Sequence, residues 1–191
     1  AIWVGGVMLV AILKPHARLE GLVVPKPHQL FFGRYFLFFV MSQIQAAVIV
    51  AGDLLVLKIQ CVEPALLFAT GAITSLVFSL LIYALTVSFG DVGKAVVVVV
   101  MVLQIAGSSG TFPIELLPDV YQKIYHIFPF PYAIDAVREC VCGLYGTTWL
   151  KNIGCLLIFG AAALVIGLLV RKPFMGLNHF MEEKLKETEM L

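Results

Sequence analysis

Residues 104–142 read QIAGSSGTFPIELLPDVYQKIYHIFPFPYAIDAVRECVC, and this stretch decides how the chain can fold. It lies between two apolar runs, yet it holds four prolines, a GSSG turn and six charged residues. Each interior proline removes a backbone hydrogen bond and clashes with the preceding turn, so no single helix crosses a bilayer here. We expect two short, proline-started helices over residues 118–128 and 131–142, each about half the ~20 residues that span hydrocarbon. Such helices dip into or lie on one face of the membrane, with their ends covered by protein or by a water-filled cavity.

The composition is that of an integral membrane protein. Hydrophobic residues make up 61% of the chain and charged residues only 13%, well beyond the apolar share of an average soluble domain. The net charge of +1 and the lack of a basic run interleaved with aromatics argue against nucleic acid as a partner. We therefore expect an all-α membrane protein with membrane lipid around it.

Apolar runs mark five crossings. The first, residues 1–13, is too short to span and is preceded by no initiator methionine, so we interpret it as the end of a helix whose upstream part is absent. Residues 36–57, 65–87 and 150–170 are long enough to span, whereas the run at residues 95–106 is short and is expected to continue through Ser108. A loop is expected at residues 88–94. The predicted membrane domain covers residues 1–173, and residues 174–191 form a polar cytoplasmic tail.

The basic residues predict the orientation. With five alternating crossings, the loops at residues 14–34 and 88–94 and the tail from Arg171 share one side and hold nine Lys and Arg residues, against four on the other side. Because short cytoplasmic loops are enriched in Lys and Arg, the first side is predicted to be cytoplasmic. The broken region between the last two crossings is then extracytoplasmic.

Several segments, in this order, resemble the C-terminal membrane domain of the YhgE/Pip (phage infection protein) family, a branch of the ABC-2 type transporter permeases. They are AGDLL at residues 51–55, TSLVFSLLIYAL at 74–85, FGDVGKA at 89–95, QIAGSSGTFPIELLP at 104–118 and FPFPYAIDAVRE at 128–139. The resemblance implies an ABC-2 type permease bundle of six helices in a bacterial cytoplasmic membrane, of which this chain holds the last five crossings and the short re-entrant outer helices. It also implies a homodimer and a separate ABC ATPase subunit.

The resemblance further implies that the first cytoplasmic loop docks on the ATPase, with Arg18, Leu19, Glu20 and Leu22 as the candidate coupling residues. The same loop could instead enforce topology and touch anionic lipid. The chain has no G-x-x-x-x-G-K-[ST] phosphate loop; the nearest segment, GDVGKA, lacks the spacing and the hydroxyl. Any ATP hydrolysis would therefore come from another polypeptide.

Asp53 is the one ionisable residue clearly inside a predicted span, and an ionisable group in lipid marks a transport pathway or a paired site by default. Its simpler interpretation is an interfacial carboxylate near Lys58. If it has a function, its expected partners are at a similar depth, at Gln104 and in the GSSG turn. The candidate pathway or gate residues are Asp53, Gln104, Gly107, Ser108, Ser109 and Gly110.

No cofactor, catalytic or metal-binding pattern is visible in the sequence. The four histidines are scattered, and no nucleophile has a plausible base beside it, so an enzyme is not expected. Cys61, Cys140 and Cys142 are predicted on the outer side, where a bridge from Cys61 to one of the others is possible, but free thiols are favoured. Asp135 and Arg138, three residues apart on one predicted helix, are expected to pair.

The predicted membrane domain and the family resemblance are consistent with two functions. The first is a permease subunit of an ABC-2 type exporter, driven by a separate ATPase, whose outer gate contains the GSSG turn and the two short helices. The second is a membrane anchor that transports nothing and carries a surface region used in phage adsorption or by a secretion apparatus.

Overall fold

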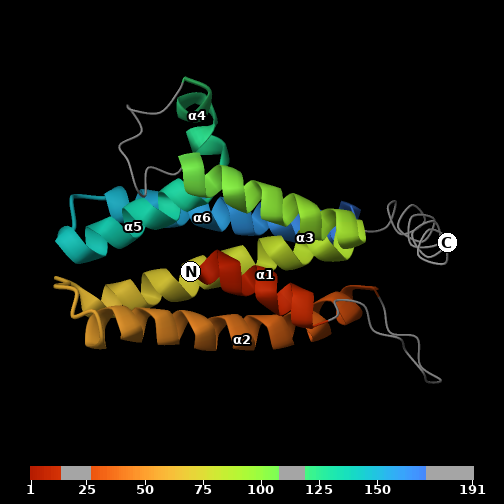
Figure 1. The fold of residues 1–191 in the computed structure, drawn as a ribbon, viewed down its shortest axis with the longest axis horizontal. Coiled ribbons are helices and arrows are strands. Elements are labelled where there is room, and N and C mark those ends of the chain that lie inside the picture. The colour runs from red at the N-terminus through yellow and green to blue at the C-terminus, as the bar shows by residue number, and fades with distance from the viewer. Residues whose placement is uncertain (14–26, 108–118, 171–191) are drawn as a thin grey trace.

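The computed structural model describes residues 1–13, 27–107 and 119–170. The described residues form helices and no strand: α1 (Ile2–Ile12), α2 (Pro27–Leu55), α3 (Pro64–Gly107), α4 (Asp119–Ile124), α5 (Phe130–Cys142) and α6 (Thr148–Val165). A 3-10 turn, Tyr125–Ile127, follows α4, and a π-helical segment, Ile166–Val170, continues α6. The helices lie side by side in one bundle, from which α4 stands away (Figure 1).

Helix α3 folds back on itself at Gly90. Gly90 has φ 61° and ψ −133°, a backbone conformation that is readily available only to glycine. The arms before and after it, residues 64–89 and 91–107, run out and back along the bundle (Figure 1). Gly93 makes this reversal possible because a Cβ atom there would collide with the backbone carbonyl oxygen of Leu85. The loop expected at residues 88–94 was therefore wrong: one glycine makes the turn, and the residues around it stay helical.

The second predicted short helix is confirmed, since α5 begins one residue before Pro131 and ends at Cys142 as predicted. The first is shorter than predicted: α4 begins one residue after Pro118 and ends at Ile124, and only the 3-10 turn continues to Ile127. The start of α2 was predicted too late, at residue 36. The helix begins at Pro27 instead, because proline is well suited to the first helical position and the polar residues after it do not break a helix. The predicted last span matches α6 with its π-helical end.

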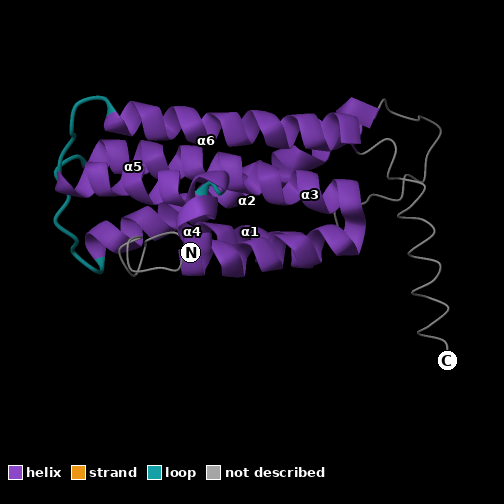
Figure 2. Ribbon diagram, turned by 90° about the horizontal axis from the view of Figure 1, so that it is seen from above, coloured by secondary structure: helices purple, strands orange, loops and turns teal. Residues whose placement is uncertain are grey.

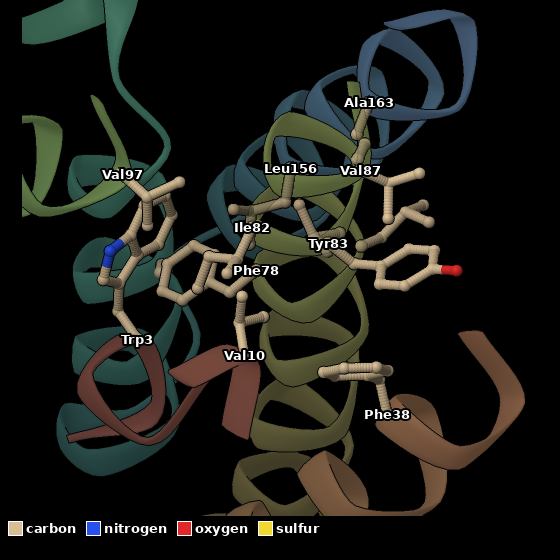
Figure 3. Close-up of a cluster of buried hydrophobic side chains, with 14 of the residues drawn as sticks. Trp3, Val10, Phe38, Phe78, Ile82, Tyr83, Val87, Val97, Leu156 and Ala163 are labelled. Atoms are coloured by element: carbon tan, nitrogen blue, oxygen red, sulfur yellow. The ribbon is translucent and has the colours of Figure 1, made fainter. Parts of the chain in front are cut away.

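The core lies around the first arm of α3, which packs against α1, α2, α5 and α6. Its centre is aromatic and aliphatic, with Trp3, Phe78, Ile82 and Tyr83 all buried (Figure 3). Close helix contacts depend on small residues: a Cβ on Gly71 would lie 2.8 Å from Val50 Cγ2.

Hydrogen bonds also tie α2 to α3. Ser75 Oγ donates to the carbonyl oxygen of Ser42 at 2.8 Å, Tyr35 donates to the carbonyl oxygen of Leu76 at 3.1 Å, and Gln43 donates to that of Ala72 at 3.1 Å. The small residues Gly71 and Ser75 are buried at this contact between α2 and α3, whereas Ala72 is exposed.

Three helical segments are long and apolar enough to cross a membrane: Phe31–Leu55, Pro64–Ile105 and Thr148–Leu168. Because the second folds back at Gly90, it supplies two antiparallel arms. The end of α1, the start of α2, the turn of α3 and the end of the segment after α6 lie at one end of the bundle, and the loops 56–63 and 143–147 lie at the other (Figures 1 and 2). The same two groups of loops were assigned to opposite sides of the membrane from the distribution of Lys and Arg residues in the sequence.

Candidate functional site at the buried start of helix α5

Helix α5 is too short to span a membrane, with 13 residues, and it lies against the first arm of α3 and against α6. Near its start, the Phe130 ring stacks on Phe78 with centroids 5.2 Å apart and meets Trp3 edge-on at 5.3 Å. Near its end, the fully buried Cys140 lies beside Thr70. Since Phe78 is two turns after Thr70, α5 runs antiparallel to the first arm of α3. Its start lies inside the bundle, with Pro129 and Pro131 buried and Phe130 half-buried.

A helix start at this depth leaves backbone N–H groups that water would otherwise satisfy. The FPFP sequence removes most of this problem, because Pro129 at the N-cap and Pro131 have no N–H group. The Phe130 N–H donates to Oε1 of Gln104 at 3.3 Å, and Gln104 is 1% exposed. The prolines and one glutamine on the second arm of α3 therefore let a helix begin inside the bundle.

The other end of α5 is held by the Thr70 hydroxyl. Thr70 Oγ1 accepts a hydrogen bond from Trp149 Nε1 at 2.9 Å and donates to the carbonyl oxygen of Leu66 at 2.8 Å. The Cys140 sulfur lies 3.3 Å from the same hydroxyl oxygen. One buried hydroxyl thus joins α3, α5 and α6.

The loop before α3, residues 56–63, closes the C-terminal end of α5. The N–H groups of Val62 and Glu63 donate to the carbonyl oxygens of Val141 and Cys140 at 3.4 and 3.2 Å. The Cys61 thiol also donates to the Cys140 carbonyl oxygen, at 3.2 Å. Helix-end carbonyls that have no partner within the helix are satisfied in this way, so the C-terminal end of α5 is held by more hydrogen bonds than its start.

The family described as "ABC-2 family transporter protein" matches residues 3–169 of this chain. The chain belongs to the ABC-2 transporter family. It is 30% identical over 152 residues to "Uncharacterized protein YhgE" of Bacillus subtilis (strain 168), a match that covers 78% of this chain and 19% of the relative. The resemblance inferred from the sequence is thereby confirmed. The chain spans about a fifth of the length of this relative, and no solved structure matches it.

As an ABC-2 family member with apolar helices of spanning length, the chain is a multi-pass membrane protein. Among the predicted site residues that the structure describes, Gln104 is the one placed in a buried contact between elements. Asp53 lies half-buried near the end of α2, and among the described residues no hydrogen bond or ion pair joins it to Gln104. Gly107 ends α3.

The remaining predicted positions are outside the described residues: Ser108 to Gly110 of the gate, and Arg18, Leu19, Glu20 and Leu22 of the coupling loop. The ion pair between Asp135 and Arg138 is confirmed at 3.1 Å, on an exposed face of α5. Cys61, Cys140, Cys142 and Cys155 are free thiols, as favoured from the sequence.

Sequence reasoning missed Trp3, Thr70, Thr74 and Phe130 as parts of the site. Thr70 and Thr74 are one helical turn apart, and this spacing in an otherwise apolar run was a usable signal. The prolines on both sides of Phe130 were used only as helix breakers, although they also show that the helix start lacks donors. Trp3 gave no signal, because a tryptophan in an apolar run usually packs in the core.

Proposed function

We propose that this chain is the permease part of an exporter, and that its helices rearrange to move an amphiphilic or polymeric substrate while a separate ABC ATPase supplies the energy. Membership of the ABC-2 family over residues 3–169 supports the transport role. The observation that carries the proposal is the start of α5, which lies inside the bundle and is bound to α3 by one side-chain hydrogen bond. A short helix with a weakly tied, buried end is suited to act as a gate.

In this proposal α1, α2, the two arms of α3 and α6 make five crossings. The end of the bundle with the α3 turn is cytoplasmic, since the loops and tail predicted on that side hold nine of the 13 Lys and Arg residues. Helices α4 and α5 then form the outer gate in a bacterial cytoplasmic membrane. The unit works as a homodimer.

The gate opens when α5 moves away from α3. That motion breaks the bond between Gln104 and Phe130 and separates Phe130 from Trp3 and Phe78, while the Thr70 hydroxyl keeps the far end of α5 in place. Gly107 and Gly110 on the preceding segment serve as pivots, and Asp53 with the Ser108 and Ser109 hydroxyls lines the outer pathway.

A membrane anchor that transports nothing is the second candidate. One observation favours it: the chain matches only 19% of the length of its Bacillus relative, so most of that protein lies outside the shared membrane part. In that case the helices are a scaffold for the remainder.

The deciding experiment places single cysteines at Arg18, Leu19, Glu20 and Leu22 of the full-length protein, in a background that lacks the four native cysteines. A thiol-reactive crosslinker is applied in native membranes, and captured proteins are identified by mass. Tyr145, which is 80% exposed on the opposite end of the bundle, is the matched control position. Capture of an ATPase from the loop but not from Tyr145, with release upon nucleotide addition, supports the permease. If the loop is accessible and captures only lipid or nothing, the anchor is favoured.

A further inference from the structure

Three buried polar atoms have no hydrogen-bond partner among the described residues: Trp3 Nε1, Thr74 Oγ1 and Gln104 Nε2. The side chains are almost fully enclosed, with exposed fractions of 1% for Trp3, 4% for Thr74 and 1% for Gln104. A buried polar group without a partner costs about 1–3 kcal/mol. Three in one small bundle therefore need an explanation, especially in a protein surrounded by lipid.

The three side chains border the same aromatic cluster. The Trp3 ring lies 5.1 Å from Phe78 and 5.3 Å from Phe130, and Gln104 is bonded to the Phe130 backbone. Thr74 is one turn before Phe78, between two positions of α3 that both contact α5. The indole nitrogen of Trp3 points away from Phe78, on the side where Val97 of the second α3 arm lies (Figure 3). Trp3 and Gln104 thus both lie at Phe130, and helical spacing puts Thr74 on the same face of α3 as Thr70 and Phe78, which contact α5.

The chemistry of these groups is that of hydrogen-bond donors. The Trp3 indole can only donate, and the Thr74 hydroxyl is free to donate. The Gln104 amide cannot be turned round to change this, because its oxygen is needed to accept from the Phe130 N–H. A ligand that satisfies the three groups must therefore offer acceptor oxygens.

The ligand group must also be uncharged. The buried polar residues of the described core are Ser, Thr and Gln, without a charged side chain among them. An isolated charge in such a place is far more costly than a neutral polar group. Carboxylate, phosphate and ammonium groups are therefore excluded, whereas ester, ether and hydroxyl oxygens fit.

An apolar cavity continues from the same place. It has a volume of about 150 Å³ and is lined by Val7, Val10 and Ala11 of α1, by Ile82 and Thr86, and by Lys94, Val97 and Val98 of the second α3 arm. The ammonium group of Lys94 is paired with Asp91, and this side chain is 42% exposed. Val7 is one turn from Trp3, so the cavity begins next to the Trp3 indole. A volume of this size is enough for a hydrocarbon group as large as benzene.

We propose that Trp3, Thr74 and Gln104 form a binding site for the neutral, oxygen-rich head group of an amphiphile, whose hydrocarbon part enters the cavity between α1 and the second arm of α3. The described structure is the closed state of this site, and the head group enters when Phe130 moves away with α5. The inference deepens the proposed export function by naming a substrate class. It rests on that function only for treating the ligand as cargo, because binding is measured without transport.

The test uses the full-length protein in phosphatidylcholine liposomes and a photoreactive diazirine analogue of 1-oleoylglycerol. An oleylamine analogue with the same diazirine position is the comparison probe, since it carries a cation and no acceptor oxygen. Labelled peptides are identified by mass spectrometry. The variants are Thr74→Val, which is isosteric, and the double variant Trp3→Phe with Thr74→Val. Ser42→Ala is the matched control, since its buried hydroxyl already donates within α2, to Phe39.

We expect the glycerol probe to label the peptides of α1 and the second α3 arm, and the amine probe to label them at least fivefold less. Labelling falls about fivefold in Thr74→Val and more in the double variant, the loss expected for each hydrogen bond removed, and Ser42→Ala labels as wild type does. The thermal unfolding midpoint of each variant shows that it is folded. Equal labelling by both probes, or in Thr74→Val and Ser42→Ala, overturns the proposal, whether or not an ATPase partner has been captured.

Discussion

Gln104 and Phe130 are 26 residues apart in the sequence, and the Phe130 N–H donates to the Gln104 side-chain oxygen at 3.3 Å. This bond joins the second arm of α3 to the first residue of α5. It also fills a donor position that would otherwise be unpaired inside the bundle. The side-chain hydrogen bond at the start of α5 therefore comes from the second arm of α3, whereas its C-terminal end is bound to Thr70 and to the loop before α3.

Replacing Gln104 by leucine leaves the Phe130 N–H without an acceptor. The expected cost is about 1–3 kcal/mol, seen as a lower unfolding midpoint in detergent and as faster hydrogen exchange in the first turn of α5. Gln43→Leu is the matched control, because its amide donates to a carbonyl at an exposed site of α3, and leucine there leaves no buried group unpaired. Equal losses in the two variants would show that Gln104 does not hold α5.

Thr70→Val removes the hydroxyl that Trp149 and Cys140 share. Valine has the same shape, so the expected loss of about 1–3 kcal/mol comes from the unpaired Trp149 indole and not from a cavity. In Thr86→Val the lost hydroxyl donated only within its own helix, to Ile82, and a change below about 0.5 kcal/mol is expected. Chemical unfolding followed by tryptophan fluorescence measures the stability of both variants. If Thr86→Val is as unstable as Thr70→Val, the proposed role of the Thr70 hydroxyl is refuted.

Gly90→Ala and Gly93→Ala disturb the reversal of α3 for different reasons. Alanine at residue 90 is strained by the positive φ, at a cost of about 1–3 kcal/mol. Alanine at residue 93 collides with the Leu85 backbone, so we expect a larger loss there. Gly154→Ala in α6 meets nothing within 4 Å and should be neutral or stabilising by up to about 1 kcal/mol. Thermal unfolding of the three variants gives the order, and a Gly93 variant as stable as the Gly154 variant contradicts the tight turn.

Cys142 and Cys140 provide a test of topology. Cys142 is exposed whereas Cys140 is buried, and burial raises the pKa of the Cys140 thiol, so little reactive thiolate forms there at neutral pH. A membrane-impermeant maleimide added outside intact cells should label Cys142 within minutes and leave Cys140 unlabelled until the protein is denatured. Single-cysteine variants keep the two signals apart. Labelling of Cys142 only after the cells are opened would reverse the proposed orientation.

The sequence was sufficient to predict the membrane class, the helices of spanning length and the positions at which the two short helices begin. Their signals are local: runs of apolar residues are long enough to span, and the prolines in residues 104–142 interrupt any single helix. The prediction of a loop at residues 88–94 was wrong because polar residues and glycines are typical both of a loop and of a tight reversal between two helical arms. Only the backbone angles of Gly90 and the contact at Gly93 distinguish the two.

The candidate site was predictable only in part. Gln104 was singled out as a possible partner of Asp53 at a similar depth, but the structure joins it to Phe130. Phe130 donates through its backbone N–H group, which every residue except proline has, so the sequence does not single it out. The roles of Trp3 and Thr70 depend on which helix faces which, and this packing is set by contacts between residues 70 or more positions apart. Periodicity within one helix carries no such information.

The reversal of α3 has one mechanical consequence. A single residue joins the two arms, so the connection is too short to let them move independently. Neither arm can slide along the neighbouring helices unless the other arm moves with it. A displacement of the α3 turn near Asp91 and Lys94, which pair at 2.7 Å, would therefore also move Gln104, because both belong to the same continuous helical arm. The exposed turn and the buried contact with α5 lie at opposite ends of the second arm of α3.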